Sequence, residues 1–296
     1  MFNPCTIDLH IHTTVSDGTD TPEELLVKVR DAGFTLFSVT DHDAIKGCLI
    51  IRSLKREGIP SFLSGAEFSC RDEKGMYHIL GYGYDLDAES IHSLVKASHE
   101  LRMKKVMARL DFLRSEFGFV FSQEDLQHLL AQDNPGKPHI ANLMVQYGYA
   151  ETKEQGIKEY INRIRFPHEF LHPEQAIRAI LAAGGIPVLA HPSFGDGDQR
   201  ILGEEMDERV RHLLDFGLQG LEAYYSGFTK DLSQEILSFA DRYDLFVTAG
   251  SDYHGKNKPI ALGSTGFDPS EPWPDGLCRF LEAASEKRIC WNEMTN

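Results

Sequence analysis

His10 and His12 are separated by one residue in a segment, 6–12, whose side chains alternate between apolar and polar. On a β-strand, residues two apart leave the same face, which places these two imidazoles about 7 Å apart along the strand. Two imidazoles so placed can chelate one transition-metal ion. Taken alone, the pair is also compatible with two histidines that are satisfied by hydrogen bonds inside a protein core.

A second group of ionisable residues, Asp41, His42 and Asp43, ends the apolar run 34–40. At the carboxyl end of a parallel strand, such an abrupt change is typical of an active site. Asp43 has a second explanation, because it could cap the helix that follows. Asp17 lies in a Ser-Asp-Gly turn, where it could be a metal ligand or could simply stabilise the turn.

Three further residues of the same kind accompany later predicted strands. Glu67 is set among small residues, and a buried carboxylate there needs a cation to offset its desolvation. His191 precedes a proline, which stops the strand with the imidazole at its tip. His78 lies near the start of a predicted strand, where a core histidine bonded to the backbone is an equal alternative.

Asp252 and His254 repeat the two-residue spacing, directly after the apolar run 246–249. Chance packing does not readily explain so many metal-type side chains at predicted strand ends. Their mixed imidazole and carboxylate character suits manganese, iron or zinc better than calcium or magnesium. We therefore predict two or three divalent metals, with manganese favoured and iron or zinc as alternatives. The nine predicted ligands are His10, His12, Asp17, His42, Glu67, His78, His191, Asp252 and His254.

Seven strands are predicted to position these side chains, and helices separate most of them. One helix begins with a capping box, in which Thr21 is the cap and Pro22 the first helical residue, and it stops near Gly33. A second helix ends near Gly58. Alternating strands and helices predict an α/β chain with a largely parallel sheet or barrel. The strands are expected at 6–12, 34–40, 60–68, 76–84, 186–190, 220–225 and 245–250, and the later helices at 173–184, 204–217 and 232–243.

Between residues 89 and 164 the strand signals vanish, and helical patterns replace them at 91–117, 123–131 and 139–148. We therefore predict two units. Residues 1–88 and 174–296 form the barrel, and residues 89–173 form a small helical insertion domain that covers the active-site mouth. The sequence has no flexible linker, which indicates that the insertion packs against the barrel.

Composition and net charge limit the classes of protein to which the chain can belong. Among 296 residues, 42% are hydrophobic and 25% are charged, which is typical of a globular protein. The net charge of −15 disfavours a general nucleic-acid binder without excluding short RNA. The sequence has no signal-peptide pattern and no long apolar run, so we expect a cytoplasmic protein without membrane contact. The five cysteines include no Cys-x-x-Cys pair, which predicts neither a disulfide framework nor a zinc knuckle.

The motifs that contain these residues resemble those of the PHP (polymerase and histidinol phosphatase) family. In order along the chain they read D-L-H-I-H, S-D-G, T-D-H-D, G-A-E, H-I-L-G-Y, L-A-H-P and G-S-D-Y-H. The resemblance covers most of the chain outside the insertion. It implies a distorted (β/α)7 barrel of the PHP type, a trinuclear metal centre and phosphoesterase activity.

The resemblance also implies how the ligands divide among the metals, with Glu67 as a bridge between two of them. In the family, some members have histidine in place of Asp17. The first metal would be held by His10, His12, Glu67 and Asp252, the second by Glu67, His78 and His191, and the third by Asp17, His42 and His254.

Within the family, the chain looks like the stand-alone nucleotide phosphoesterase branch, because of its length, its insertion and the Lys-Pro-His segment at 137–139. Relatives usually have Arg-Pro-His there, and lysine keeps the charge that attracts phosphate without the bidentate fork. Arg165 could replace a lysine that relatives have before the next helix. Arg102 and Arg109 could face the barrel mouth or belong to a solvated helix face. The predicted substrate-binding residues are Lys137, His139, Arg165 and Arg102.

The predicted reaction is the release of phosphate from a small nucleotide by attack of a metal-activated hydroxide. A 3′,5′-bisphosphonucleotide is the leading substrate, because its two phosphates would use both the metals and the Lys137 region. The leaving oxygen needs a proton or a third metal. The candidates for that role are Asp17, His42, His254 and His139.

Other functions are also compatible with the sequence. The alternatives are a phosphatase for AMP or another mononucleotide, a 5′→3′ exonuclease on short oligoribonucleotides, and, less favoured, a histidinol phosphate phosphatase. A different class, a non-catalytic metal-binding PHP module, is disfavoured by the complete set of nine ligand positions. A small phosphorylated nucleotide is the expected partner, and no obligate protein partner is predicted.

Overall fold

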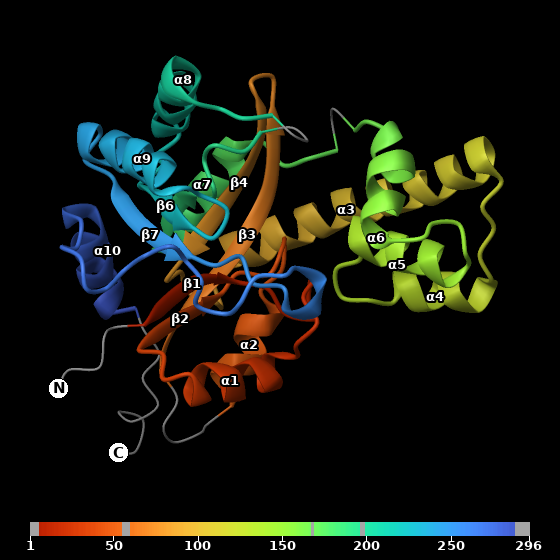
Figure 1. Cartoon of the computed structure of the whole chain (residues 1–296), viewed down its shortest axis with the longest axis horizontal. Coiled ribbons are helices and arrows are strands. Elements are labelled where there is room, and N and C mark those ends of the chain that lie inside the picture. Colours follow the sequence, from red (N-terminus) through yellow and green to blue (C-terminus); the bar gives the residue numbers. More distant parts are fainter. Residues whose placement is uncertain (1–5, 55–59, 167–168, 196–198, 288–296) are drawn as a thin grey trace.

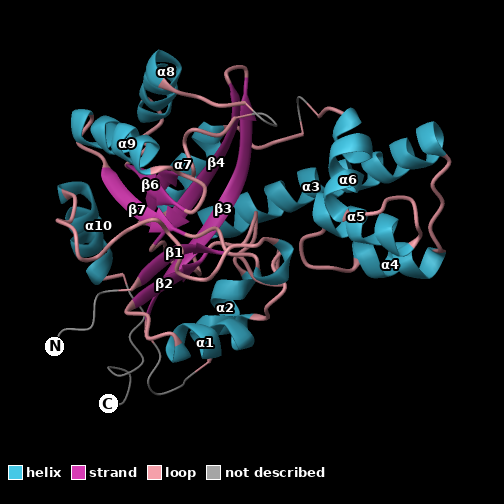
Figure 2. Ribbon diagram, viewed as in Figure 1, coloured by secondary structure: helices cyan, strands magenta, loops and turns pink. Residues whose placement is uncertain are grey.

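Seven strands form one sheet, in chain order, in the computed structural model of the protein. The strands are β1 Ile7–Ile11, β2 Leu36–Val39, β3 Ser61–Asp72, β4 Gly75–Tyr82, β5 Ile186–Leu189, β6 Gly220–Tyr225 and β7 Phe246–Gly250. The structure describes residues 6–54, 60–166, 169–195 and 199–287. Main-chain hydrogen bonds join the segment after β7 to β1, from Asp252 N to His10 O at 2.8 Å and from His12 N to Tyr253 O at 2.9 Å. The sheet therefore nearly closes (Figure 2), and the predicted seven-stranded α/β barrel is confirmed.

One strand, β4, runs against both of its neighbours, whereas β1 to β3 and β5 to β7 are parallel. β3 extends to Asp72, beyond the predicted end at 68, and a short turn leads into β4. Gly75 follows this turn at a φ of 139°, which glycine adopts most easily. The expected alternation of strand and helix is broken here, because a tight turn can only join antiparallel strands.

Six helices surround the barrel in the described part of the chain: α1 Pro22–Asp31, α2 Lys46–Ser53, α7 Pro173–Ala182, α8 Gly203–Leu214, α9 Lys230–Arg242 and α10 Asp275–Ser285. In Figure 1, α1 and α2 lie below β1 and β2, and α9 and α10 lie beside β6 and β7. α1 begins with the predicted capping box between Thr21 and Glu24. α10 is not among the predicted elements, and its Leu277 and Phe280 complete the core. The predicted helix that ends near Gly58 corresponds to α2, and residues 55–59 lie outside the described ranges.

A helical segment joins β4 to α7. It consists of α3 Glu89–Phe117, α4 Gln123–Leu130, α5 Lys137–Gln146, α6 Lys153–Gln155, the π-helix η1 Gly156–Tyr160 and the 3₁₀ helix η2 Ile161–Arg163. The later part of α3 packs with α4 and α5 around a second hydrophobic cluster that contains Val106 and Met144. Ile91 and Leu94, near the start of α3, pack in the barrel core instead. The division into two domains at residue 89, with the insertion over the mouth, stays a prediction.

At 29 residues, α3 is the longest described helix. Neither it nor any other helix within the described ranges is both long and apolar enough to cross a membrane. Three cysteines, Cys48, Cys70 and Cys278, are free thiols, and the first two are buried. Cys5 and Cys290 lie outside the described residues.

Polar side chains of β1 turn into the barrel. All five residues of β1 are buried, including those of the predicted polar face. Asp8 accepts hydrogen bonds from Ser251 N at 2.9 Å, Ser251 Oγ at 2.6 Å and Gly263 N at 2.9 Å. Burial raises the pKa of Asp8 to about 6, although these hydrogen bonds oppose the shift. Asp8 thereby fastens β1 to the segment after β7 and sets the position of His10.

Candidate metal centre

The nine predicted ligands form one connected cluster inside the barrel. Three come from strands, namely His10, Glu67 and His78, and the others follow strand ends or lie in the loop after β1. Each of the nine has a nitrogen or oxygen atom within 4 Å of a charged partner in the cluster. Every side chain that the sequence selects as a ligand therefore reaches one site.

Glu67 lies at the centre of the cluster and is 1% exposed. Its Oε2 atom is 3.2 Å from His10 Nε2, 3.1 Å from His12 Nε2 and 3.1 Å from His42 Nδ1. Its Oε1 atom faces other histidines, 2.8 Å from His78 Nδ1 and 3.1 Å from His191 Nε2. The two oxygens thus face two different groups of ligands, as a bridging carboxylate requires.

The spacing in the first implied ligand set matches that of a metal site. His10 Nε2 and His12 Nε2 are 3.1 Å apart, and Asp252 Oδ1 lies 3.6 and 3.4 Å from them. Ligand atoms about 2.1 Å from a tetrahedral ion are about 3.4 Å apart. In the second set, His78 Nδ1 lies 3.3 Å from His191 Nε2. Both groups can therefore hold an ion without large rearrangement.

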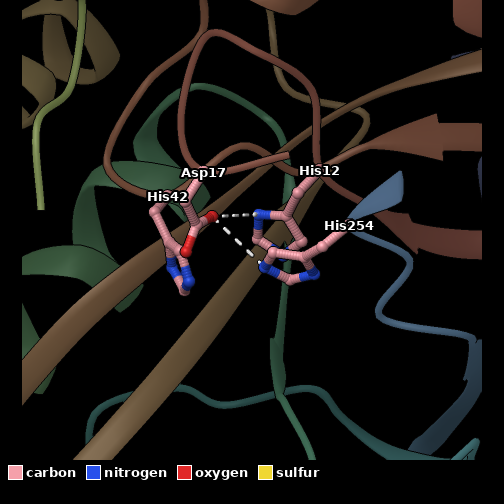
Figure 3. A group of neighbouring side chains, drawn as sticks. All are labelled: His12, Asp17, His42 and His254. Atoms are coloured by element: carbon pink, nitrogen blue, oxygen red, sulfur yellow. Dashed lines mark ion pairs between the residues drawn. The ribbon is translucent and has the colours of Figure 1, made fainter. Parts of the chain in front are cut away.

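The third set contains one more residue than the resemblance implies. Figure 3 shows the Asp17 carboxylate facing both His254 and His12, with His42 beside them. Asp17 Oδ1 is 3.2 Å from His254 Nε2 and 3.8 Å from His12 Nδ1. Each of the four residues offers one donor atom, and these atoms lie within 4.8 Å of one another. His12 therefore faces the first set through Nε2 and the third through Nδ1.

Several atoms of the cluster are buried without a hydrogen bond to any described residue. They are Asp17 Oδ1, His42 Nδ1, Glu67 Oε2 and His191 Nδ1. A buried acceptor or carboxylate oxygen without a hydrogen-bond donor is costly, and divalent cations at the first and third sets would satisfy the Asp17, His42 and Glu67 atoms. The donor set, imidazole nitrogens with carboxylate oxygens, also fits such ions. On this test, the residues present fit a cluster of divalent metals.

Glu222, in β6, orients two of the histidines and is not among the predicted residues. It is fully buried, its Oε1 accepts from His10 Nδ1 at 2.8 Å, and its Oε2 accepts from His191 N at 2.8 Å. Because a carboxylate can only accept, the His10 proton sits on Nδ1, and the Nε2 lone pair is left for a metal. The sequence signal was a lone carboxylate within an apolar strand, the same signal that identifies Glu67.

Asp252 is also oriented by hydrogen bonds to the carboxylate oxygen that faces away from the histidines. The donors are residues that were not predicted from the sequence. Its Oδ2 accepts from Tyr225 Oη at 2.8 Å and from Lys258 Nζ at 2.6 Å, so that Oδ1 faces the histidines. The His254 Nδ1 proton goes to the main-chain carbonyl of Asp252 at 2.8 Å, which leaves Nε2 free. Asp252 and His191 have φ angles of 58° and 27°, which non-glycine residues rarely adopt and which cluster at functional sites.

The charges in the cluster perturb the pKa values of its members. Burial opposes the ionisation of Glu67, but the surrounding imidazoles, His42 first, hold its pKa well below the usual range. Burial opposes a charge on His10 and His12, yet neighbouring carboxylates raise both pKa values, that of His12 to about 9. Burial lowers the pKa of His42 to about 3. Burial also lowers the pKa of His254 below its ordinary value. Without metals, the carboxylates therefore hold a proton on the His10–His12 pair.

Metal uptake by the metal-free protein should release about one proton per chain at pH 7. The pKa of His12 lies above the ordinary value of 6.5, so the pair is charged at pH 7 and loses its charge as pH passes about 9. Only one proton is expected, because the His10 and His12 Nε2 atoms are 3.1 Å apart and two positively charged rings at that distance would repel each other. Ligation needs neutral imidazoles, so manganese affinity should rise about tenfold per pH unit up to about pH 9.

This release can be measured by adding manganese to chelator-treated, dialysed protein in weak buffer with a pH indicator, and by binding titrations from pH 6 to 9. Manganese added to the same buffer without protein is the control. An affinity that is independent of pH, with no proton released, would contradict a charged His10–His12 pair.

Unlike the nine predicted ligands, the predicted substrate-binding residues do not all lie at the cluster. Arg102 forms an ion pair with Asp43, the residue after His42. His139 accepts from Gly136 N through Nδ1 at 3.0 Å. Burial lowers the pKa of His139, against the opposing effect of nearby Asp17. Arg102 and His139 therefore lie beside the cluster of nine predicted ligands, which we call the metal-type cluster.

The other two predicted residues differ from each other. Lys137, at the start of α5, donates to Asn162 Oδ1 at 2.7 Å and acts electrostatically on Lys105 of α3. Arg165 is exposed, and among the described residues nothing joins its side chain to the cluster. A role for Arg165 in substrate binding stays a prediction.

Known proteins resemble this chain over most of its length. A 5′-3′ exoribonuclease of Haemophilus influenzae is 29% identical, over 86% of this chain and 92% of the relative. A 3′,5′-nucleoside bisphosphate phosphatase of Chromobacterium violaceum is 28% identical, over 96% of this chain and 97% of the relative. The solved structure of a candidate metal-dependent phosphoesterase from Bifidobacterium adolescentis superposes with a TM-score of 0.80 at 29% identity, covering 95% of this chain and 97% of that one.

The family model for the PHP domain matches residues 8–216. The match includes all of the nine metal-type residues except Asp252 and His254, which lie beyond its end. Sequence motifs, barrel, ligand cluster and relatives agree. The chain therefore belongs to the PHP domain family and is a metal-dependent phosphoester hydrolase.

Proposed function

We propose that the protein removes a phosphate from small nucleotides, with 3′,5′-bisphosphonucleotides as the leading substrates. The observation that carries this proposal is the position of Arg102 and His139 beside the metal-type cluster, close to Asp43 and Asp17 respectively. One nucleotide could then place one phosphate at the cluster and a second at the cationic side chains. The Chromobacterium relative, which is named for this activity, supports the choice of substrate.

Divalent metals held by the nine residues would polarise a phosphoryl group and supply an activated water as nucleophile. The chain contributes orientation, because Glu222 fixes the rings of His10 and the main chain of His191. It also offers a proton near the leaving group. His139 Nδ1 accepts from Gly136 N, so the neutral ring has its hydrogen on Nε2. We assign the leaving-group side to this ring together with Asp17, His42 and His254.

Manganese is the metal that we propose, because the ligands mix imidazole nitrogen with carboxylate oxygen. Metal analysis of the purified protein, followed by chelation and reconstitution with manganese, iron or zinc, tests this assignment. Manganese should restore the highest phosphate release. Full activity with zinc and none with manganese would contradict the choice of metal without affecting the reaction.

A phosphate-release screen tests the proposed reaction. Metal-loaded protein is offered adenosine 3′,5′-bisphosphate, AMP, histidinol phosphate and a short 5′-phosphorylated oligoribonucleotide, and chelated protein is the control. The bisphosphate should give the highest kcat/KM. Release from none of these substrates, with metals bound, would exclude the proposed function and leave the non-catalytic metal-binding module.

A second candidate, 5′→3′ exonuclease activity on short RNA, is favoured by the Haemophilus relative, which is named an exoribonuclease. The net charge of −15 disfavours long RNA as a substrate. Preference for the oligoribonucleotide in the same screen would select this candidate instead.

Lys137→Ala should raise KM for the bisphosphate about tenfold while metal content stays at the wild-type level. A charge-assisted hydrogen bond to phosphate contributes roughly 1.5–3 kcal/mol, which corresponds to tenfold or more in affinity. Steady-state kinetics and metal analysis measure both quantities. Lys158→Ala, an exposed lysine in the same helical segment, is the matched control. Unchanged kinetics for Lys137→Ala would contradict the placement of the insertion over the barrel mouth.

A further inference from the structure

Four cationic side chains gather where α3 meets the start of α5. Arg102, Lys105 and Arg109 are spaced three and four residues apart on α3, so they share one helix face. Lys137 begins α5 and acts electrostatically on Lys105. We call these four residues the cation group. A helix face of this composition is usually solvated, but Lys105 is only 6% exposed and Arg109 only 7%.

Among the residues that the structure describes, few groups compensate the two buried cations. The carboxylate that faces Lys105 is Asp43, which is already paired with Arg102. Lys105 Nζ lies 3.5 Å from the centre of the Phe170 ring, and the Arg109 guanidinium lies 4.9 Å from that of Phe166. For Arg109, this contact leaves a hydrogen-bond donor unused, because an aromatic face does not replace a charged acceptor.

Arg109 shows the deficit most directly. Its Nε atom is buried and has no hydrogen-bond partner among the described residues. Burial lowers its pKa to about 10, and the nearby Arg102 acts in the same direction. Burial also lowers the pKa of Lys105 to about 7, although Asp43 opposes the shift. A buried cluster of like charges with an unused donor is unfavourable unless an anion joins it.

The cation group adjoins the metal-type cluster. Asp43 is the residue after His42, and it also accepts from Ser69 N in β3 at 2.9 Å, two residues beyond Glu67. Arg102 reaches this carboxylate from α3, and Arg102 Nη1 also lies beside Gly136, which donates to His139. One small molecule could therefore contact both the metal ligands and the cation group.

We propose that Lys105 and Arg109 bind the phosphate of the substrate that is not hydrolysed, as a doubly charged phosphate monoester. This inference rests on the proposed function. Among the described residues, four cationic side chains face one carboxylate, and a bound anion would raise the lowered pKa of Lys105 again. The net positive charge favours a dianion over the singly charged phosphodiester of an RNA chain. The guanidinium of Arg109 offers the planar donor pair that suits phosphate oxygens. The cation group would thus select nucleotides with two terminal phosphates over those with one.

The test compares Lys105→Met and Arg109→Met with Lys104→Met. Methionine keeps the apolar stem, and removal of an uncompensated buried charge is commonly neutral or stabilising, so both variants should fold. Lys104 is the exposed neighbour of Lys105 on the same helix and is the matched control. Thermal unfolding of each variant without added anion checks folding.

Two readouts are taken on metal-loaded protein. The first is the ratio of kcat/KM for adenosine 3′,5′-bisphosphate to that for whichever adenosine monophosphate, 3′ or 5′, the wild type hydrolyses. The second is the rise in Tm that inorganic sulfate produces. We expect each buried-site variant to lower the ratio about tenfold and to lose part of the sulfate-induced rise, whereas Lys104→Met changes neither.

Sulfate bound at the metals contributes equally to all variants, so a difference between them reports on the cation group. The inference would be overturned if both buried-site variants matched Lys104→Met in the kcat/KM ratio and in the sulfate-induced rise in Tm. Lys105 and Arg109 would then be packing residues. If the wild type hydrolyses no nucleotide, the proposed function fails, and the sulfate response alone then decides whether the group binds an anion. The kcat/KM for a 5′-phosphorylated dinucleotide is measured in the same variants. If it falls by the same factor as that for the bisphosphate, the cation group binds a 5′-terminal phosphate whether or not a second nucleotide follows, which would overturn the selection of mononucleotides with two terminal phosphates.

Discussion

Glu67→Gln should leave the protein with less than its full complement of metal and lower kcat by about 1,000-fold or more. The two Glu67 oxygens face two groups of ligands, with Oε2 near His10, His12 and His42 and Oε1 near His78 and His191. Glutamine has the same shape but no charge, and its amide nitrogen turns protons toward one of these groups. Both metal positions therefore lose affinity together.

Metal analysis and steady-state phosphate release on wild type and variant measure the two effects. Glu116→Gln, which changes an exposed carboxylate at the end of α3, is the control for loss of one negative charge. Because an empty cluster is itself unfavourable, circular dichroism should accompany the kinetics. A folded Glu67→Gln variant with full metal content and wild-type kcat would exclude Glu67 as a bridge.

The members of the cluster other than Asp17 could be predicted from the sequence, because each places an ionisable side chain where an apolar strand ends or is interrupted. His10 and His12 illustrate the strength of this signal, since the two-residue spacing fixes a common face before any tertiary structure is known. The second contact of His12, with Asp17, could not be predicted. It depends on the rotation of one ring, which turns Nε2 toward Glu67 and Nδ1 toward Asp17.

The residues that support the cluster carry weaker sequence signals. Glu222 lies in the middle of β6 rather than at its end, where a carboxylate suggests an exposed strand face as readily as a site. Tyr225 and Lys258 meet Asp252 only because the sheet nearly closes. Such contacts join residues from separate parts of the chain, and a single sequence has no periodicity that marks them.

The reversal of β4 could have been recognised from the sequence. Predicted strands at 60–68 and 76–84 leave too few residues between them for the helical crossover that parallel strands need. α3 is different, because its hydrophobic pattern changes along its length. Its first turns serve the barrel core and its later turns serve a second cluster, so the sequence does not reveal that Lys105 and Arg109 are buried.

Glu222→Gln should weaken metal binding about 10- to 100-fold and lower turnover by a similar factor, although Glu222 is not a predicted ligand. Its carboxylate fixes the proton of His10 on Nδ1 and so presents the Nε2 lone pair to the metals. An amide can accept from only one of its two present partners, His10 Nδ1 and His191 N, and it removes the charge that makes His10 a stronger ligand.

A structural role alone would give a different result. Loss of packing would lower the Tm of metal-free and metal-loaded protein equally, whereas loss of ligand orientation should shrink the rise in Tm that manganese produces. Glu208→Gln, an exposed carboxylate on α8, is the matched control. If Glu222→Gln bound manganese as tightly as the wild type and turned over as fast, the orientation of His10 would have to come from β1 alone, with Asp8 and the closure to Asp252 sufficient to hold it.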